Sequence, residues 1–122
     1  MENIAEKRNC DHEAVEAKQS SISLALALDC IRVNIWNYLG NTVNIPPASL
    51  PYKNEQDKMA ERNRNIINDL NEEDRNVFNL QNEKGHTLYD QTIGEILKEA
   101  DQQGYKNHPF VVANRDLFEE EQ

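Results

Sequence analysis

The sequence predicts a mainly α protein, an irregular bundle of four to five helices around one central helix. Apolar residues are densest in residues 21–40, and they recur there with the spacing of an amphipathic helix. Three later segments each combine a helix-capping residue with an apolar face of helical period. No series of alternating strands is present, so helices must supply the core.

The central helix is expected to be apolar on two sides. One broad face holds Leu24, Ala27, Leu28, Ile31, Ile35, Tyr38 and Leu39, and the opposite stripe holds Ile22, Leu26, Cys30, Val33 and Trp36. A helix with two apolar sides is covered on both, either by its own chain or by a second copy. Ser20 or Ser21 is expected to cap its start, and Gly40 is expected to follow its last turn.

A membrane span is not expected in this stretch, although it is long enough for one. Asp29 and Arg32 interrupt it, and charged side chains inside a bilayer are energetically costly. Because the two residues are three apart on a helix, they are expected to pair on its surface.

The segments on either side of the central helix are polar or rich in proline. Residues 1–19 are expected to form a solvated segment, because they contain few apolar residues. Residues 41–52 contain three prolines and are expected to form an extended loop. Asn54 is then expected to cap a helix with a narrow apolar face made of Met59, Ile66, Ile67 and Leu70.

Two further helices are predicted from their caps. Asn71 precedes three acidic residues, which favours the start of a short helix that carries Val77, Phe78 and Leu80. Thr87 and Asp90 have the spacing of a capping box, and the helix that they begin is expected to keep its period until Gly104.

The C-terminal residues have less regular patterns. Residues 109–113 (PFVVA) are expected to form a strand or an extended segment, and residues 115–122 an acidic, mobile tail. Residues 85–100 resemble the turn and first helix of an ankyrin repeat. No second copy occurs at the required spacing, so a repeat protein is not expected.

Length and charge limit the functions to consider. The 122 residues fit a single helical domain, 1–122, that can bury its own core. Asp and Glu number 22 against 13 Lys and Arg, for a net charge of −9, so nucleic acid is not an expected ligand. The acidic excess is concentrated after residue 82, where it either faces a basic partner or keeps the protein soluble.

The two cysteines and three histidines do not predict a catalytic or metal site. Cys30 lies in the apolar stripe beside Asp29, where we expect a free core cysteine rather than a reactive thiolate, and therefore a reducing compartment. Cys10 and His12 could supply two metal ligands, but a structural zinc site needs four. His86 and His108 read as loop residues. We therefore expect no cofactor, no metal and no catalysis. Residues 1–19 lack the apolar core of a signal peptide.

Binding to another protein is the remaining function. The plausible contact anchors are the apolar and aromatic residues outside the helical faces, although each could instead pack within a loop: Leu50, Tyr52, Tyr105, Phe110 and Phe118. A homodimer is expected to form through the second stripe, at Ile22, Leu26, Val33 and Trp36, unless residues 2–19 or 109–113 cover that stripe within one chain.

Residues 116–122 (DLFEEEQ) resemble the glutamate-rich C-terminal export signals of Legionella type IV effectors. In size, helical pattern, asparagine content and acidity, the chain is similar to the small effectors that antagonise the ubiquitin-directed enzymes MavC and MvcA. The resemblance implies a non-catalytic, dimeric inhibitor that binds a deamidase or transglutaminase of papain-like fold and keeps away ubiquitin or its conjugating enzyme. It also implies the bacterial cytoplasm and, after export, the host cytoplasm. It assigns no binding residue.

Two other classes of function remain open at this point. An acidic helical protein of this size could be a phage-type decoy that mimics nucleic acid, for which the C-terminal acidic excess is the supporting feature. It could also be a small cysteine-dependent enzyme. A decoy would lose its partner steeply as salt rises, whereas an apolar interface would lose it much less.

Overall fold

The computed structural model describes residues 22–119, with the side chains of residues 22–117. This part of the chain is helical and contains no strand, which confirms the predicted fold class. The helices are α3 (Leu24–Thr42), α4 (Leu50–Asn68), α5 (Glu72–Asn79), α6 (Leu88–Gln102), α7 (Pro109–Ala113) and α8 (Arg115–Glu119). The expectation for residues 1–19 lies outside the described residues.

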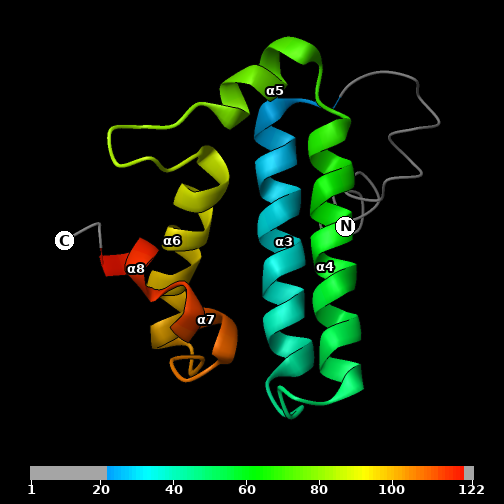
Figure 1. Cartoon of the computed structure of the whole chain (residues 1–122), viewed down its shortest axis with the longest axis vertical. Coiled ribbons are helices and arrows are strands. Elements are labelled where there is room, and N and C mark those ends of the chain that lie inside the picture. Colours follow the sequence, from blue (N-terminus) through cyan, green and yellow to red (C-terminus); the bar gives the residue numbers. More distant parts are fainter. Residues whose placement is uncertain (1–21, 120–122) are drawn as a thin grey trace, which may run out of the picture.

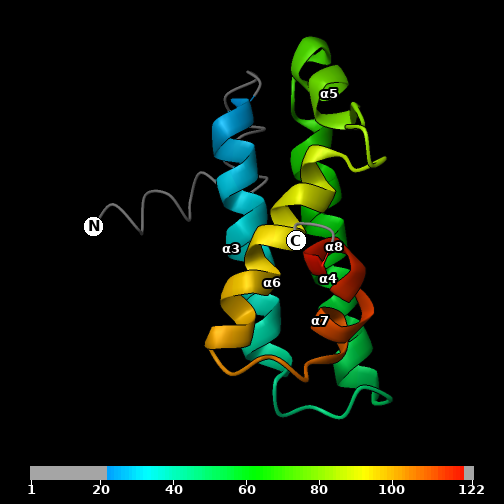
Figure 2. The same cartoon turned by 90° about the vertical axis from the view of Figure 1, so that its left-hand side faces the viewer.

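Helix α3 is the centre of the bundle. It runs antiparallel to α4 and packs against α6 on another side, while α5 lies across the end where α4 finishes (Figure 1). The short helices α7 and α8 follow α6, and α8 packs back along it while α7 packs against α8 (Figure 2). The predicted arrangement around one two-sided helix is therefore confirmed.

The ends of α3 differ from the prediction. Its N-cap is Ser23, whose Oγ accepts the N–H of Leu26 at 3.1 Å, and not Ser20 or Ser21. Gly40 does not end the helix, because α3 continues to Thr42. A Cβ atom at Gly40 would lie 3.7 Å from the hydroxyl of Tyr105, which is an ordinary van der Waals contact.

Helix α4 begins at Leu50, earlier than the predicted cap at Asn54. Ser49 is the N-cap, and its Oγ accepts the N–H of Tyr52 at 3.3 Å. Pro51 is accommodated because the backbone N–H groups of the first helical turn have no acceptor within the helix, so no hydrogen bond is lost where proline lacks an N–H. The prolines therefore shape the start of a helix here, and the prediction of an extended loop was wrong for residues 50–52.

The caps predicted for α5 and α6 are confirmed. The Asn71 side chain accepts the Asp74 N–H at 2.7 Å, and Thr87 and Asp90 bond each other's backbone N–H at 3.1 and 3.3 Å. Gly104 follows α6 with a φ of 95°, a left-handed conformation that favours glycine.

The C-terminal residues are more ordered than predicted. Residues 109–113 form α7 rather than a strand, because His108 caps the segment and Pro109 suits its first turn. Residues 115–119 form α8, so the expected mobile tail is wrong for them, and residues 120–122 lie outside the described residues. Arg115 holds α8 in place by donating to Asp101 at 2.9 Å and to the carbonyl of Lys106 at 3.1 Å.

The buried face of α3 includes most of the predicted broad face. Leu24 and Leu28 are only half-buried, whereas the polar residues Asn34 and Thr42 are buried. Asp29 and Arg32 form the predicted surface pair at 3.0 Å. The remaining core comes from the inner faces of the other helices and from Leu70, which lies between α4 and α5. The helical members are Tyr52, Met59, Ile66, Phe78, Ile93, Ile96, Leu97, Ala100 and Val111.

Cys30 is fully buried, as expected, but it is not a free thiol. It is disulfide-bonded, and the chain's other cysteine, Cys10, lies outside the described residues. The expectation of a free core cysteine was therefore wrong, and the inference of a reducing compartment loses its support. Among residues 22–119, no helix is both long and apolar enough to cross a membrane.

The core assignment predicts unequal effects for two identical substitutions. Leu39→Ala should lower the free energy of unfolding by about 2–5 kcal/mol, because the side chain is 0% exposed and its loss leaves a cavity. Leu50→Ala should stay within about 0.5 kcal/mol, because Leu50 is 69% exposed. Chemical denaturation measures both, and equal effects would contradict the assigned core.

Candidate functional site

Three predicted contact residues come together inside the molecule. Tyr52, Tyr105 and Phe110 lie around His108 and Tyr38, near the end of α3 and the start of α4. The ring centroids of Tyr38 lie 5.6 Å from those of both His108 and Phe110. We call these five residues the aromatic cluster. Tyr52 is only 5% exposed, so in this conformation it is a core residue and not a contact anchor.

His108 connects α7 to α3 through both of its ring nitrogens. The Phe110 N–H donates to Nδ1 at 3.0 Å, so this nitrogen is the unprotonated one. Nε2 therefore carries the proton and donates to Thr42 Oγ1 at 2.8 Å, while the Thr42 hydroxyl donates to the Tyr38 carbonyl at 2.6 Å. Since Nε2 is a donor toward Thr42, this pair is not arranged as a base that activates a hydroxyl nucleophile.

The phenol of Tyr38 completes this connection by reaching α4. It donates to the hydroxyl of Tyr52 at 2.7 Å. Burial raises the pKa of Tyr38 well above its usual value, and this hydrogen bond is a second, smaller cause of the same shift. The hydrogen bonds of the aromatic cluster thus join α3, α4 and α7 with neutral groups.

A second buried polar contact joins α3, α4 and α6 in the middle of the bundle. Asn34 donates to Asn63 Oδ1 at 2.9 Å, and Asn63 donates to the hydroxyl of Tyr89 at 3.2 Å. Burial raises the pKa of Tyr89. Both asparagines are nearly inaccessible to solvent, so their hydrogen bonds must be made within the protein.

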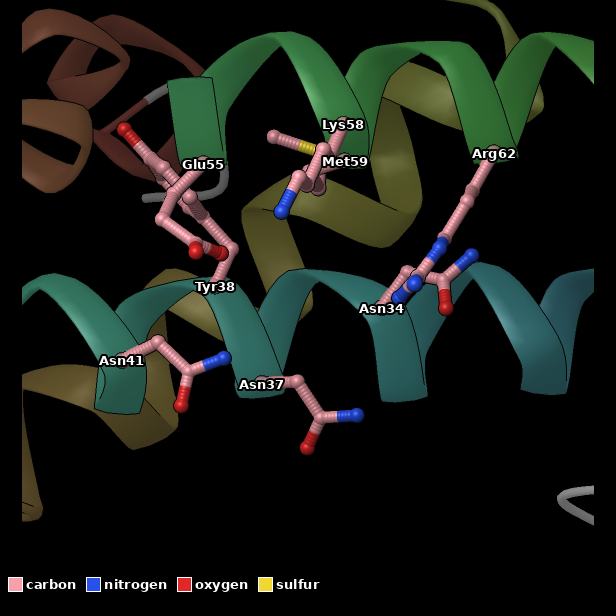
Figure 3. A pocket seen from close by; sticks show the side chains of 8 residues that line it. All are labelled: Asn34, Asn37, Tyr38, Asn41, Glu55, Lys58, Met59 and Arg62. Atoms are coloured by element: carbon pink, nitrogen blue, oxygen red, sulfur yellow. The ribbon is translucent and has the colours of Figure 1, made fainter. Parts of the chain in front are cut away.

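A polar groove lies along the outside of the α3–α4 hairpin (Figure 3). Asn34, Asn37, Tyr38 and Asn41 line it from α3, and Glu55, Lys58, Met59 and Arg62 line it from α4. Its enclosed volume is only about 20 Å³, whereas small-molecule pockets span roughly 300–1,000 Å³. The groove is therefore a surface that another macromolecule can contact rather than a substrate pocket.

An exposed leucine lies at one end of this hairpin. Leu50 begins α4, close to the turn that follows α3. Leu50 is not part of the groove lining, but we group it with the four exposed groove residues as one candidate surface of the same hairpin, which we call the α3–α4 face: Asn37, Asn41, Leu50, Lys58 and Arg62. Amide, cationic and apolar groups are all present on this face, as in the contact surfaces of protein complexes.

The other residues predicted to contact a partner or a second copy differ in how far they are buried. Tyr105 and Phe110 are half-buried, and the side chain of Phe118 lies outside the described residues. Ile22 is buried, and its N–H bonds the carbonyl of Asp69 at 3.3 Å, so it does not offer a dimer contact in this conformation. Leu26, Val33 and Trp36 are half-buried, and Trp36 packs against Tyr105 with centroids 6.0 Å apart.

Sequence reasoning missed the polar part of this surface. The asparagines at positions 34, 37 and 41 have helical spacing along one side of α3, and this repeat was visible in the sequence. Lys58 and Arg62 are also one helical turn apart, but only the packing of α4 beside α3 brings them to the same groove.

Comparison with known proteins supplies no relative for this arrangement. No protein-family model, no curated protein and no solved structure matches the chain. Within residues 22–119, no three His, Cys, Asp or Glu side chains are grouped so that they could hold a metal ion.

The environment of His108 predicts a pH-dependent loss of stability. Burial lowers the pKa of His108 from 6.5, so the unfolded chain binds this proton more readily than the folded one. The contribution of His108 to the free energy of unfolding is therefore complete above about pH 6.5. It is lost as pH falls from there toward the lower pKa of the folded state. Protonation of Nδ1 would also displace the Phe110 N–H. The rings that face His108 belong to Tyr38, Tyr52 and Tyr105.

The matched variant is His108→Asn, which can still cap α7 but cannot titrate. The stability difference between wild type and this variant should shrink or reverse as pH falls below 6.5, as measured by urea denaturation at several pH values. The effect of carboxylate titration on stability is the same in both proteins, so it cancels when their free energies of unfolding are subtracted. A difference that is constant with pH would contradict this account.

Proposed function

We propose that this protein is a non-catalytic inhibitor that acts by binding another protein. The observation that carries this proposal is the α3–α4 face, an exposed surface with amide, cationic and apolar groups on two long, mutually packed helices. Since both helices are tied together by buried hydrogen bonds, the face is preorganised and loses little conformational entropy on binding.

The hydrogen bonds of one buried histidine and two tyrosines agree with a binding role. His108, Tyr38 and Tyr89 all use their polar atoms to join helices, and none of them lines the α3–α4 groove as a free acid or base. Inhibition would then come from occupying the surface of the target, so that its substrate cannot approach.

The proposed target is a ubiquitin deamidase or transglutaminase of papain-like fold. This part of the proposal rests on the resemblance of residues 116–122 to Legionella type IV export signals and on the acidic, helical character of the chain. The protein would bind the enzyme and exclude ubiquitin or its conjugating enzyme, first in the bacterial cytoplasm and, after export, in the host cytoplasm.

The proposal predicts different effects for two exposed leucines. Leu50 and Leu80 are 69% and 67% exposed, but Leu50 belongs to the α3–α4 face and Leu80 follows α5 at the other end of the bundle (Figure 1). Leu50→Asp should weaken inhibition of the deamidase by roughly tenfold or more, about 1.4 kcal/mol, because it places a charge in an apolar contact. Leu80→Asp should leave inhibition nearly unchanged. Intact-mass spectrometry of ubiquitin follows the deamidation.

A second pair tests the cationic part of the face. Arg62→Glu should weaken inhibition, whereas Arg64→Glu, an identical change at an exposed residue outside the groove lining, should not. Circular dichroism confirms that each variant is folded. If wild-type protein at saturating concentration leaves the deamidase fully active, the proposed target is wrong. If wild-type protein inhibits but the two variants within each pair have equal effects, the α3–α4 face is not the contact surface.

An inhibitor that acts by binding should also act stoichiometrically. Residual deamidase activity should fall in proportion to the added protein and should not decline further with time. An enzyme would instead inactivate all of the target at catalytic amounts, with a rate that depends on its concentration. Progress curves at several ratios of protein to target separate these outcomes, and time-dependent complete inactivation at low ratios would refute the non-catalytic role.

A further inference from the structure

One side of α3 faces away from the two helices that pack most closely against it, α4 and α6. Asn34 bonds α4 and Arg32 bonds α6, and these two contacts divide the circumference of α3 into two arcs. The inner arc is fully buried, at Ile31, Ile35 and Leu39. Leu26 and Val33 lie on the outer arc and are half-buried, so part of each side chain is accessible.

Cys30 lies on the same outer arc, about one helical turn from both Leu26 and Val33. We call these three residues the outer stripe. Cys30 is 0% exposed and is disulfide-bonded. The chain has only two cysteines, so a disulfide within one chain joins Cys30 to Cys10. This bond ties the N-terminal segment to the outer stripe.

Residues 11–21 connect this bond to the start of α3, and their length limits the path that they can take. Cys30 lies six positions after Leu24, where α3 begins, which is about 9 Å along the helix axis. The eleven residues 11–21 reach roughly 36 Å when extended, so the segment has to leave the start of α3 and turn back to its side. Leu26 lies between the two ends of this loop. Because the disulfide already fixes both ends, little further entropy is lost when the segment packs on the stripe.

The segment contains apolar side chains that can make this contact. Ala14, Val15 and Ala17 are apolar, and Val15 is the largest of them. The outer stripe has only two half-buried apolar side chains, so a short apolar patch is enough to remove them from water. The charged residues of the segment can remain solvated on its other side.

We infer that residues 11–21 cover the outer stripe while the disulfide is intact, with Val15 against Leu26 and Val33, and that reduction releases this cover. The sequence left open whether a second copy or residues 2–19 cover these apolar side chains. The disulfide favours the chain's own segment, because it brings that segment to the stripe at no cost in association entropy.

Reduction by a dithiol supplies two electrons and two protons. The Sγ–Sγ bond breaks, each cysteine gains an S–H hydrogen, and the dithiol closes into its own disulfide. The segment is then attached to α3 only through the backbone at Ile22, so Leu26 and Val33 become accessible to another protein. Exposure of this apolar face therefore depends on the redox state. The inference is independent of the proposed inhibition, because its test measures only this chain.

Hydrogen exchange of the full chain, followed by mass spectrometry with and without dithiothreitol, provides the experiment. Backbone amides of residues 11–21 should exchange at least about tenfold more slowly in the oxidised protein, because only there are they packed against α3. Amides of α6, on another side of α3, should exchange equally in both. Cys10→Ser should match the reduced protein whether or not dithiothreitol is present.

A matched pair of variants separates packing from the disulfide itself. Val15→Asp should remove the protection of residues 11–21 while the disulfide remains, because it places a charge against an apolar surface. Val112→Asp, an identical change at a 56% exposed residue of α7, should leave the protection unchanged.

An uncharged apolar dye tests the exposure of the stripe. Nile red is suitable because the net charge of −9 does not repel it. Its fluorescence should rise when dithiothreitol is added to the wild type, and Leu26→Ser/Val33→Ser should lose most of this rise. Circular dichroism checks that each protein is folded before and after reduction.

Three results would overturn the inference. The first is a species of twice 14.1 kDa that is linked by the disulfide, because Cys30 would then be joined to another chain. The second is equal exchange of residues 11–21 with and without dithiothreitol, or equal protection in Val15→Asp and Val112→Asp. The third is unfolding of the whole protein on reduction, because the disulfide would then brace the fold and hold no releasable cover.

Discussion

The burial of α3 from two directions is the constraint on which the rest of the structure depends. A helix with apolar residues on most of its circumference cannot be stable beside a single neighbour, because one side would remain in water. Here α4 covers one side and α6 another, and the chain between these helices must return across the bundle to permit this. Helix α5 and the turn before α6 make that crossing (Figure 1).

Buried polar contacts give this arrangement its specificity. Apolar faces alone tolerate sliding of one helix along another, whereas a buried hydrogen bond is lost when the register changes. Asn34 with Asn63 fixes α3 against α4 in the middle of the bundle, and Tyr38 with Tyr52 fixes the same pair near its end. His108 does the same for α7, so a segment of only five helical residues has a defined position.

The α3–α4 groove and a second hollow beside α6 both depend on α3. Asn37 lines the groove and the neighbouring Trp36 lines the hollow, because successive residues on a helix point about 100° apart. One rigid helix therefore contributes side chains to two separate features of the surface.

Local sequence by itself determined the helical class, the two-sided central helix, and the caps at Asn71, Thr87 and Gly104, because each depends on residues within one or two turns. Tertiary structure decided what depends on contacts between distant segments. His108 is ordered as the cap of α7 because Thr42 accepts a hydrogen bond from its Nε2–H, and Tyr52 is a core residue because it accepts a hydrogen bond from Tyr38. The groove and the hollow likewise exist only where α4 and α6 bring their charged residues beside α3, since hydrophobic periodicity carries no information about which polar faces will meet.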